Sequence, residues 1–103
     1  MNYTFEELSS KVISWANNRD LIRFENANRQ FLKVTEEVGE LAGAIARKDD
    51  REIEDAMGDT LVTLIILSKQ LGIDPVECLA VAYAVIANRT GKTVNGVFIK
   101  DEE

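Results

Sequence analysis

Acidic side chains in this 103-residue sequence fall into two groups with helical spacing. The first group shares one stripe of a predicted helix with a lysine and consists of Lys33, Glu36, Glu37 and Glu40. The second group lies on one face of the next predicted helix and consists of Glu52, Asp55 and Asp59. Carboxylates gathered in this way repel one another unless a cation neutralises them, so the spacing indicates a metal site.

The chemistry of these side chains favours a hard cation. The sequence contains no His, and oxygen ligands without His or Cys select Mg²⁺, Mn²⁺ or Ca²⁺ over zinc. Mg²⁺ commonly binds through a few carboxylates together with substrate phosphates, which indicates phosphate chemistry. The absence of His also excludes a Cys–His or Ser–His catalytic pair.

A short turn at residues 48–50 should make the two acidic helices antiparallel neighbours. Glu40 lies about nine residues before the turn and Asp59 about ten after it, so the two side chains should stand nearly level. After Asp59 the helix becomes apolar almost all round at residues 61–67, which predicts burial on every side. A carboxylate that borders such a buried segment lowers the stability of the fold unless its charge is paired, and this favours a bound cation over a surface that faces only water.

Acidic stripes on helices are more often solvated faces than sites, so a second interpretation stays open. In it, the chain is a non-catalytic helical module whose acidic face docks a basic partner. The net charge of −6 argues against binding to nucleic acid or to an anionic membrane surface. Metal titration separates the catalytic interpretation from the docking one.

The sequence is typical of a cytoplasmic protein. The first residues lack a basic region followed by an apolar one, and the longest apolar stretch is too short to span a bilayer. The single cysteine, Cys78, cannot form an internal disulfide and lies in an apolar run, where we expect a buried structural thiol.

Start and stop signals divide residues 1–103 into one all-α domain of four helices. Thr4 and Glu7 form a capping box, Asp49 or Asp50 can cap the third helix, and Asp74 precedes a proline at the start of the fourth. The first predicted helix follows Thr4 and ends near residues 17–20, and the other three lie at about 27–47, 51–71 and 75–89.

The C-terminal tail should be a short extended segment or hairpin. Asn95 and Gly96 stand between β-favouring residues, which is a hairpin signal. Two strands so short are marginal alone, so we expect the tail to pack against helices or a neighbouring subunit. The apolar half of the third helix needs more cover than its neighbours offer, which predicts a homodimer or homotetramer.

The two acidic segments resemble a known family. Residues 33–41, KVTEEVGEL, and residues 55–62, DAMGDTLV, are similar to the MazG-like all-α nucleoside triphosphate pyrophosphohydrolases. The signature of this family is Glu-Glu-x-x-Glu followed by Glu-x-x-Asp on two antiparallel helices. The tail at residues 88–98 resembles that of small, often phage-type, members.

The resemblance implies Mg²⁺-dependent hydrolysis, with Mn²⁺ as an alternative metal, of (deoxy)nucleoside triphosphates to the monophosphate and pyrophosphate. Such an activity serves nucleotide-pool housekeeping. A related pyrophosphohydrolase acting on a phosphoribosyl nucleotide is the alternative within the same chemistry. The sequence does not identify the base or the sugar.

One position departs from the family pattern. The family acid three residues before the final Asp falls at Ala56, which cannot bind a metal. Asp55 shares a face with Asp59 and is the expected substitute, although Glu52 with Asp55 is the formal Glu-x-x-Asp match. The expected metal ligands are Glu37, Glu40, Asp55 and Asp59.

The remaining site residues follow from their positions around the acids. Glu36 and Glu37 are the expected catalytic residues that position water, and Glu36 could instead bind metal. Lys33 either contacts a phosphate or forms an ordinary helix ion pair. Trp15 is expected in the core, with base stacking as the alternative. Candidates for phosphate or sugar contact from the fourth helix and the tail are Asn88, Arg89 and Lys92.

Overall fold

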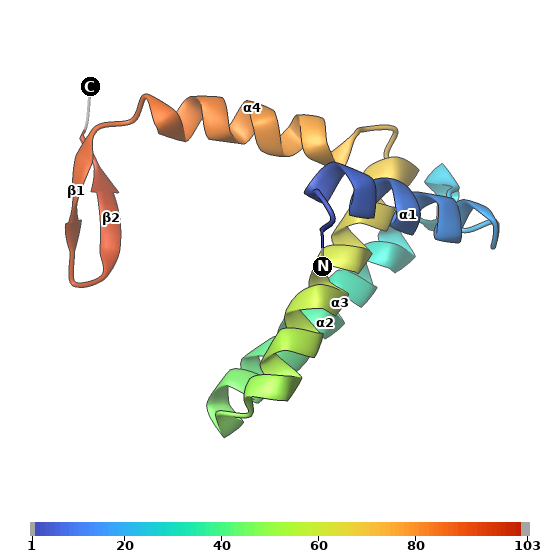
Figure 1. The fold of residues 1–103 in the computed structure, drawn as a ribbon, viewed down its shortest axis with the longest axis horizontal. Coiled ribbons are helices and arrows are strands. Elements are labelled where there is room, and N and C mark those ends of the chain that lie inside the picture. Colours follow the sequence, from blue (N-terminus) through green and yellow to red (C-terminus); the bar gives the residue numbers. More distant parts are fainter. Residues whose placement is uncertain (1, 102–103) are drawn as a thin grey trace.

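The computed structural model describes residues 2–101 and shows four helices followed by a two-stranded hairpin (Figure 1). The elements are α1 (Phe5–Asn17), a short 3-10 turn at Phe24–Asn26, α2 (Ala27–Arg47), α3 (Asp50–Gln70), α4 (Pro75–Ala87), β1 (Gly91–Val94) and β2 (Val97–Lys100). The predicted all-α class with a hairpin tail is confirmed. The α2 helix has its predicted bounds, α3 begins and ends one residue earlier than predicted, and α4 ends two residues earlier.

Three helices begin at side-chain caps that the sequence predicted. The Thr4 hydroxyl accepts the backbone N–H of Glu7 at 3.0 Å and donates to the Glu7 carboxylate at 3.2 Å. Asp49 accepts the N–H of Glu52 at 3.1 Å, and Asp74 accepts the N–H of Val76 at 3.0 Å. Each bond satisfies an N–H that the first turn of a helix leaves without a partner.

The helices α2 and α3 run side by side and form the most extensive helix contact, and their connecting turn points away from α1 and α4 (Figure 1). Lys48 closes the turn between them in a left-handed conformation with φ 57°. Ala44 and Ala56 are 1% and 7% exposed, and these small side chains let the two helices approach closely near the turn. Farther along, Gln30 of α2 donates to the carbonyl of Thr63 at 3.2 Å.

The α1 helix packs against the second half of α3, whose inner face contributes Ile65 and Ile66 to the core. The expectation that residues 61–67 are buried on every side is wrong at two positions. Leu61 and Leu64 are 43% and 44% exposed because α1 and α2 cover only part of the α3 surface. Gln70, at the end of α3, donates to the carbonyl of Leu21 at 2.8 Å and fixes the loop after α1.

The α4 helix leaves the end of α3 and extends away from the other helices (Figure 1). Every residue of α4 after Val76 is exposed, including Cys78, so the expectation of a buried thiol is wrong. Within residues 2–101, no single helix is long and apolar enough to cross a membrane. Only α3 and α4 together pass on length and composition, and they are bent by 102°.

The hairpin lies at the far end of α4 (Figure 1). Its strands pair antiparallel, with Val94 opposite Val97, and the turn uses φ 52° at Asn95 and φ 79° at Gly96. Two positive φ values are the type I′ pattern that the Asn-Gly pair predicted. In the described part of the chain the hairpin packs against none of the helices, so the expected packing on helices is wrong.

Candidate functional site

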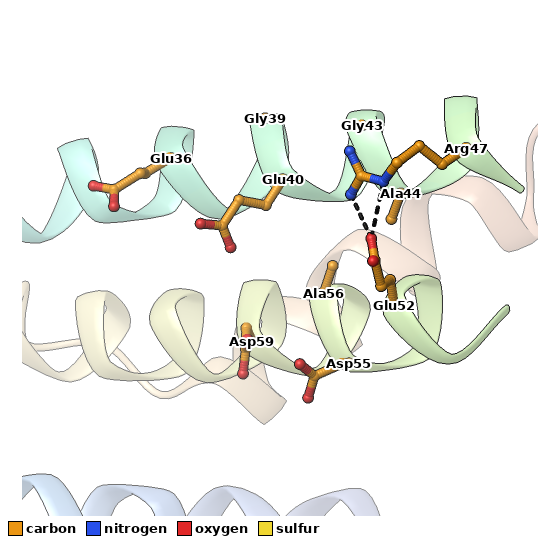
Figure 2. Close-up of a pocket in the computed structure, with 10 residues that line it drawn as sticks. All are labelled: Glu36, Gly39, Glu40, Gly43, Ala44, Arg47, Glu52, Asp55, Ala56 and Asp59. Carbon is orange, nitrogen blue, oxygen red and sulfur yellow. Dashed lines mark hydrogen bonds and ion pairs between the residues drawn. The ribbon is translucent and has the colours of Figure 1, made fainter. Parts of the chain in front are cut away.

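An open pocket with a volume of about 580 Å³ lies along the α2–α3 pair (Figure 2). Its lining comes only from these two helices and consists of Glu36, Gly39, Glu40, Gly43, Ala44, Arg47, Glu52, Asp55, Ala56 and Asp59. The lining positions recur every three or four residues on each helix, so one face of α2 meets one face of α3. The two glycines of α2 add no side chains and leave the pocket wide.

The pocket brings together most of the predicted acids. Glu36 and Glu40 enter from α2, and Glu40 extends toward α3, while Asp55 and Asp59 lie one turn apart on α3 (Figure 2). All four side chains are exposed to solvent. The antiparallel pairing of the helices, which the short turn predicted, is what places acids from two distant segments on one surface.

Glu52 is already neutralised by a basic neighbour. The guanidinium of Arg47 forms a two-nitrogen ion pair with one oxygen of Glu52, and the bond from Nε measures 3.1 Å (Figure 2). Among the described residues no such ion pair reaches Asp55. Asp55 is therefore the better replacement for the family acid, because a carboxylate held by Arg47 has less negative charge to offer a cation.

Ala56 occupies the helix–helix contact at the floor of the pocket. It is 7% exposed and lies between α2 and α3 (Figure 2). An acidic side chain at position 56 would have its Cβ atom buried in the contact between the two helices, whereas Asp55 is exposed at the edge of that contact. This position is consistent with the expectation that Asp55, one residue earlier, takes the place of the family acid.

Glu37 does not line the pocket surface but lies beside it. It is half-buried, and its Oε2 atom is buried without a hydrogen-bond partner in the part of the chain described. Burial raises the pKa of Glu37 above its ordinary value, and the negative charges of Glu40 and Asp59 raise this pKa further, with Lys33 opposing the rise. The charges of Glu40 on α2 and Asp59 on α3 therefore both act on Glu37, so the two acidic segments interact electrostatically.

The residues fit a divalent cation in charge and donor type. The orphaned oxygen of Glu37 is the kind of atom that a bound cation satisfies, and the pKa of Glu37 is raised first by burial and then by the negative charges of Glu40 and Asp59. Oxygen donors alone are the set that Mg²⁺ prefers. Across residues 2–101, no group of three acidic side chains converges closely enough to hold a metal ion, so binding requires side chains to rotate inward.

Lys33 and Trp15 lie outside the acidic pocket. Lys33 forms no ion pair with Glu36 or Glu37 in the described residues, although its charge acts on Glu37. Trp15 is 49% exposed, so the preferred expectation of a core position is wrong. Its ring lies under the guanidinium of Arg19, at 4.2 Å from the ring centre, and lines a separate groove on α1 and α3.

Asn88 and Lys92 are not brought to the pocket within one chain. Asn88 ends α4 and donates to the carbonyl of Ala84 at 3.3 Å, while Lys92 lies on β1. The thirteen residues of α4 carry both side chains about 20 Å from the end of α3, at a rise of about 1.5 Å per residue. The same applies to Arg89, which follows Asn88.

Sequence reasoning missed three residues that shape the pocket. Gly39, Gly43 and Arg47 line it together with Glu36 and Glu40. Gly39 and Gly43 each lie three residues after an acid, and Arg47 lies four residues after Gly43, so this spacing could have placed all three on the same face. The ion pair from Arg47 to Glu52 could not be foreseen, because the turn had to be built before the two residues met.

Comparisons with known proteins agree with this geometry. The family model for the MazG nucleotide pyrophosphohydrolase domain matches residues 25–92, which contain α2, α3 and α4. The chain is also 37% identical, over 71 residues, to an uncharacterized 18.2 kDa protein from the rep-hol intergenic region of Haemophilus phage HP1 (strain HP1c1). That match covers 69% of this chain and 44% of the phage protein, so the chain spans less than half the length of this relative. No solved structure matches.

Proposed function

This chain belongs to the MazG nucleotide pyrophosphohydrolase domain family, and from that premise we propose that it hydrolyses (deoxy)nucleoside triphosphates to the monophosphate and pyrophosphate. The observation that carries the proposal is the pocket between α2 and α3, with carboxylates on both walls. Such a substrate is found in the cytoplasm, where the activity would serve nucleotide-pool housekeeping.

We assign metal binding to four carboxylates, with Mg²⁺ as the metal and Mn²⁺ as its substitute. The ligands are Glu37, Glu40, Asp55 and Asp59. When bound, a divalent cation neutralises phosphate oxygens and lowers the pKa of a coordinated water. The surroundings of Glu37 support this assignment. Its carboxylate is partly buried near the negative charges of Glu40 and Asp59, and a cation bound there would offset their repulsion.

Three residues of α2, one in the pocket and two beside it, are proposed to act on water and phosphate. Glu36, exposed at the pocket wall, can accept a hydrogen bond from the attacking water and orient its oxygen toward the phosphorus. Glu37 lies next to it, and whichever of its carboxylate oxygens does not bind the metal can also accept a hydrogen bond from that water. Lys33, one helical turn before both acids, can donate to a phosphate oxygen.

The test is a panel of nucleoside and deoxynucleoside triphosphates with separate detection of pyrophosphate and inorganic phosphate. We expect pyrophosphate release that requires Mg²⁺ or Mn²⁺ and disappears with EDTA. If only a phosphoribosyl nucleotide is hydrolysed, the reaction would still be a pyrophosphohydrolysis, but the substrate would be that nucleotide and not a nucleoside triphosphate. Calorimetric titration with Mg²⁺ and Mn²⁺ is the companion measurement, since absence of binding at millimolar metal would support a non-catalytic docking module.

A further inference from the structure

The end of the pocket nearest the turn between α2 and α3 carries a basic side chain. Among the described residues that line the pocket, five are acidic and only Arg47 is basic. A polyphosphate that enters this pocket brings further negative charge, and carboxylates repel each phosphate oxygen that a bound cation does not neutralise. A cationic donor beside the carboxylates therefore favours such a substrate, and Arg47 is placed to supply it.

The guanidinium of Arg47 keeps hydrogen-bond donors free although it forms an ion pair. Its Nε and Nη2 atoms both donate to one oxygen of Glu52, and the bond from Nε measures 3.1 Å (Figure 2). In the described part of the chain its Nη1 atom donates to no acceptor. The Arg47 side chain is 60% exposed. Because a guanidinium is planar, Glu52 can fix its orientation while Nη1 stays available to a ligand.

A glycine of α2 makes room for this guanidinium. A Cβ atom at Gly43 would lie 3.1 Å from Nη1 and 3.8 Å from Cζ of Arg47, so the guanidinium lies against bare helix backbone. Figure 2 shows the Arg47 side chain running back along α2 in the direction of Glu40. Gly43 follows Glu40 by three residues, which is about 4.5 Å along the helix axis. The free nitrogen therefore lies about one helical turn from a carboxylate that we assign to the metal.

We propose that Arg47 binds the pyrophosphate half of the triphosphate, so that the substrate lies along the α2–α3 pocket with its terminal phosphate toward the turn. This assignment rests on the proposed function, because it orients the substrate named there. A planar guanidinium matches the arrangement of phosphate oxygens. A donor that Glu52 already holds also loses little side-chain freedom when it binds. The nucleoside half then lies toward Glu36, at the other end of the pocket lining.

An ion pair that only joins α2 to α3 is the competing explanation, and the two explanations differ in the role of Glu52. If Arg47 acts on the fold through Glu52, removal of either partner should have the same effect. If Nη1 contacts phosphate, removal of Arg47 should weaken binding, whereas removal of the Glu52 charge should not. Arg51 is a control for net charge, since it is an exposed arginine of α3 that does not line the pocket.

Calorimetric titration with inorganic pyrophosphate in the presence of Mg²⁺ tests the contact without turnover. Arg47→Gln should raise the dissociation constant of pyrophosphate by about tenfold or more, because it removes charge-assisted hydrogen bonds. Glu52→Gln and Arg51→Gln should change this constant by about threefold or less. Arg47→Lys keeps the charge but loses the planar fork, so its affinity should lie between those of the wild type and Arg47→Gln. The lysine variant carries the test if Arg47→Gln does not fold.

Inhibition by the two products tests the orientation of the substrate. In Arg47→Gln, pyrophosphate should inhibit at a concentration about tenfold higher or more, and the monophosphate product at an unchanged concentration. The reverse pattern would overturn the orientation.

Three binding results would overturn the assignment of Arg47 even if the wild type hydrolyses triphosphates. They are a wild type that binds no pyrophosphate, full affinity in Arg47→Gln, and equal losses of affinity in Arg47→Gln and Glu52→Gln. Pyrophosphate binding that depends on Arg47, in a chain that hydrolyses no triphosphate, would instead overturn the proposed function and leave the pyrophosphate contact standing.

Discussion

At the scale of single residues, Glu37 links the fold to the proposed chemistry. Its carboxylate is half-buried beside Glu40 and Asp59, and this burial and charge raise its pKa above the ordinary value of 4.5. A raised carboxyl pKa means that folding favours the protonated form. The contribution of Glu37 to stability is therefore greatest below pH 4.5 and is lost as the pH rises through the folded-state value.

Glu37→Gln should therefore separate stability from metal binding. At pH 7 without metal, the variant should melt a few degrees above the wild type because an uncompensated charge is removed. It should also lose most of the stabilisation that millimolar Mg²⁺ gives the wild type. Thermal melts with EDTA and with Mg²⁺ measure both effects. Glu54→Gln, an exposed residue of α3 outside the pocket, is the control, and equal behaviour of the two variants would contradict the role of Glu37.

Asp55 and Glu52 give a second prediction at the same scale. Asp55→Asn should lower the metal-dependent kcat/KM by about 100-fold or more, because it removes a proposed ligand. Glu52→Gln should retain most activity and lose about 0.5 kcal/mol of stability, since its ion pair with Arg47 is solvent-exposed. Steady-state pyrophosphate release and urea unfolding measure these changes. The opposite ranking of the two activities would show that Glu52 is the ligand.

At the scale of elements, the sequence was informative wherever a local rule applied. Caps at Thr4, Asp49 and Asp74 located three helix starts, and the Asn-Gly pair located the hairpin turn. The facing of the two acidic helices followed from the short turn between them. Local rules failed where burial depends on distant segments, as for Leu61, Trp15 and Cys78. Apolar character predicted burial for all three, but a single chain does not supply the covering element.

The close packing of α2 against α3 depends on a small side chain at their contact, and substitutions in α2 test this. Ala44 is 1% exposed at their contact, whereas Ala42 on the same helix is exposed. Ala44→Leu should overpack the contact and lower the free energy of unfolding by about 1–3 kcal/mol. Ala42→Leu should change it by about 0.5 kcal/mol or less. Urea unfolding of both variants provides the measurement, and equal costs would show that Ala44 does not set the helix spacing.

At the scale of the whole molecule, the course of α4 decides which chain can supply Asn88 and Lys92 to a pocket. Within one chain these residues lie at the far end of α4, away from the acidic walls (Figure 1). If the protein forms the predicted homodimer and Lys92 contacts substrate phosphate, we expect α4 and β1 to bring Lys92 to the pocket of the second copy. Each pocket would then combine acids from one chain with a basic group from the other.

Mixing two inactive variants tests this arrangement. Glu40→Gln removes a proposed ligand from the pocket, and Lys92→Ala removes the basic group from β1. When the two homodimers are exchanged, random reassociation should restore about a quarter of wild-type activity, because half of the dimers are mixed and each mixed dimer has one intact pocket. Recovery should follow subunit exchange in time. No recovery despite proven exchange would place Lys92 in the pocket of its own chain or outside the reaction.

The central claim is that the carboxylate pocket between α2 and α3 performs a metal-dependent pyrophosphohydrolysis. The measurement that tests it most directly is product analysis on the triphosphate panel with Mg²⁺. For the substrate that is turned over, the account predicts one pyrophosphate for each monophosphate formed, no activity in EDTA and a loss of activity in Asp59→Asn. Release of inorganic phosphate, or turnover that survives both EDTA and Asp59→Asn, would contradict it.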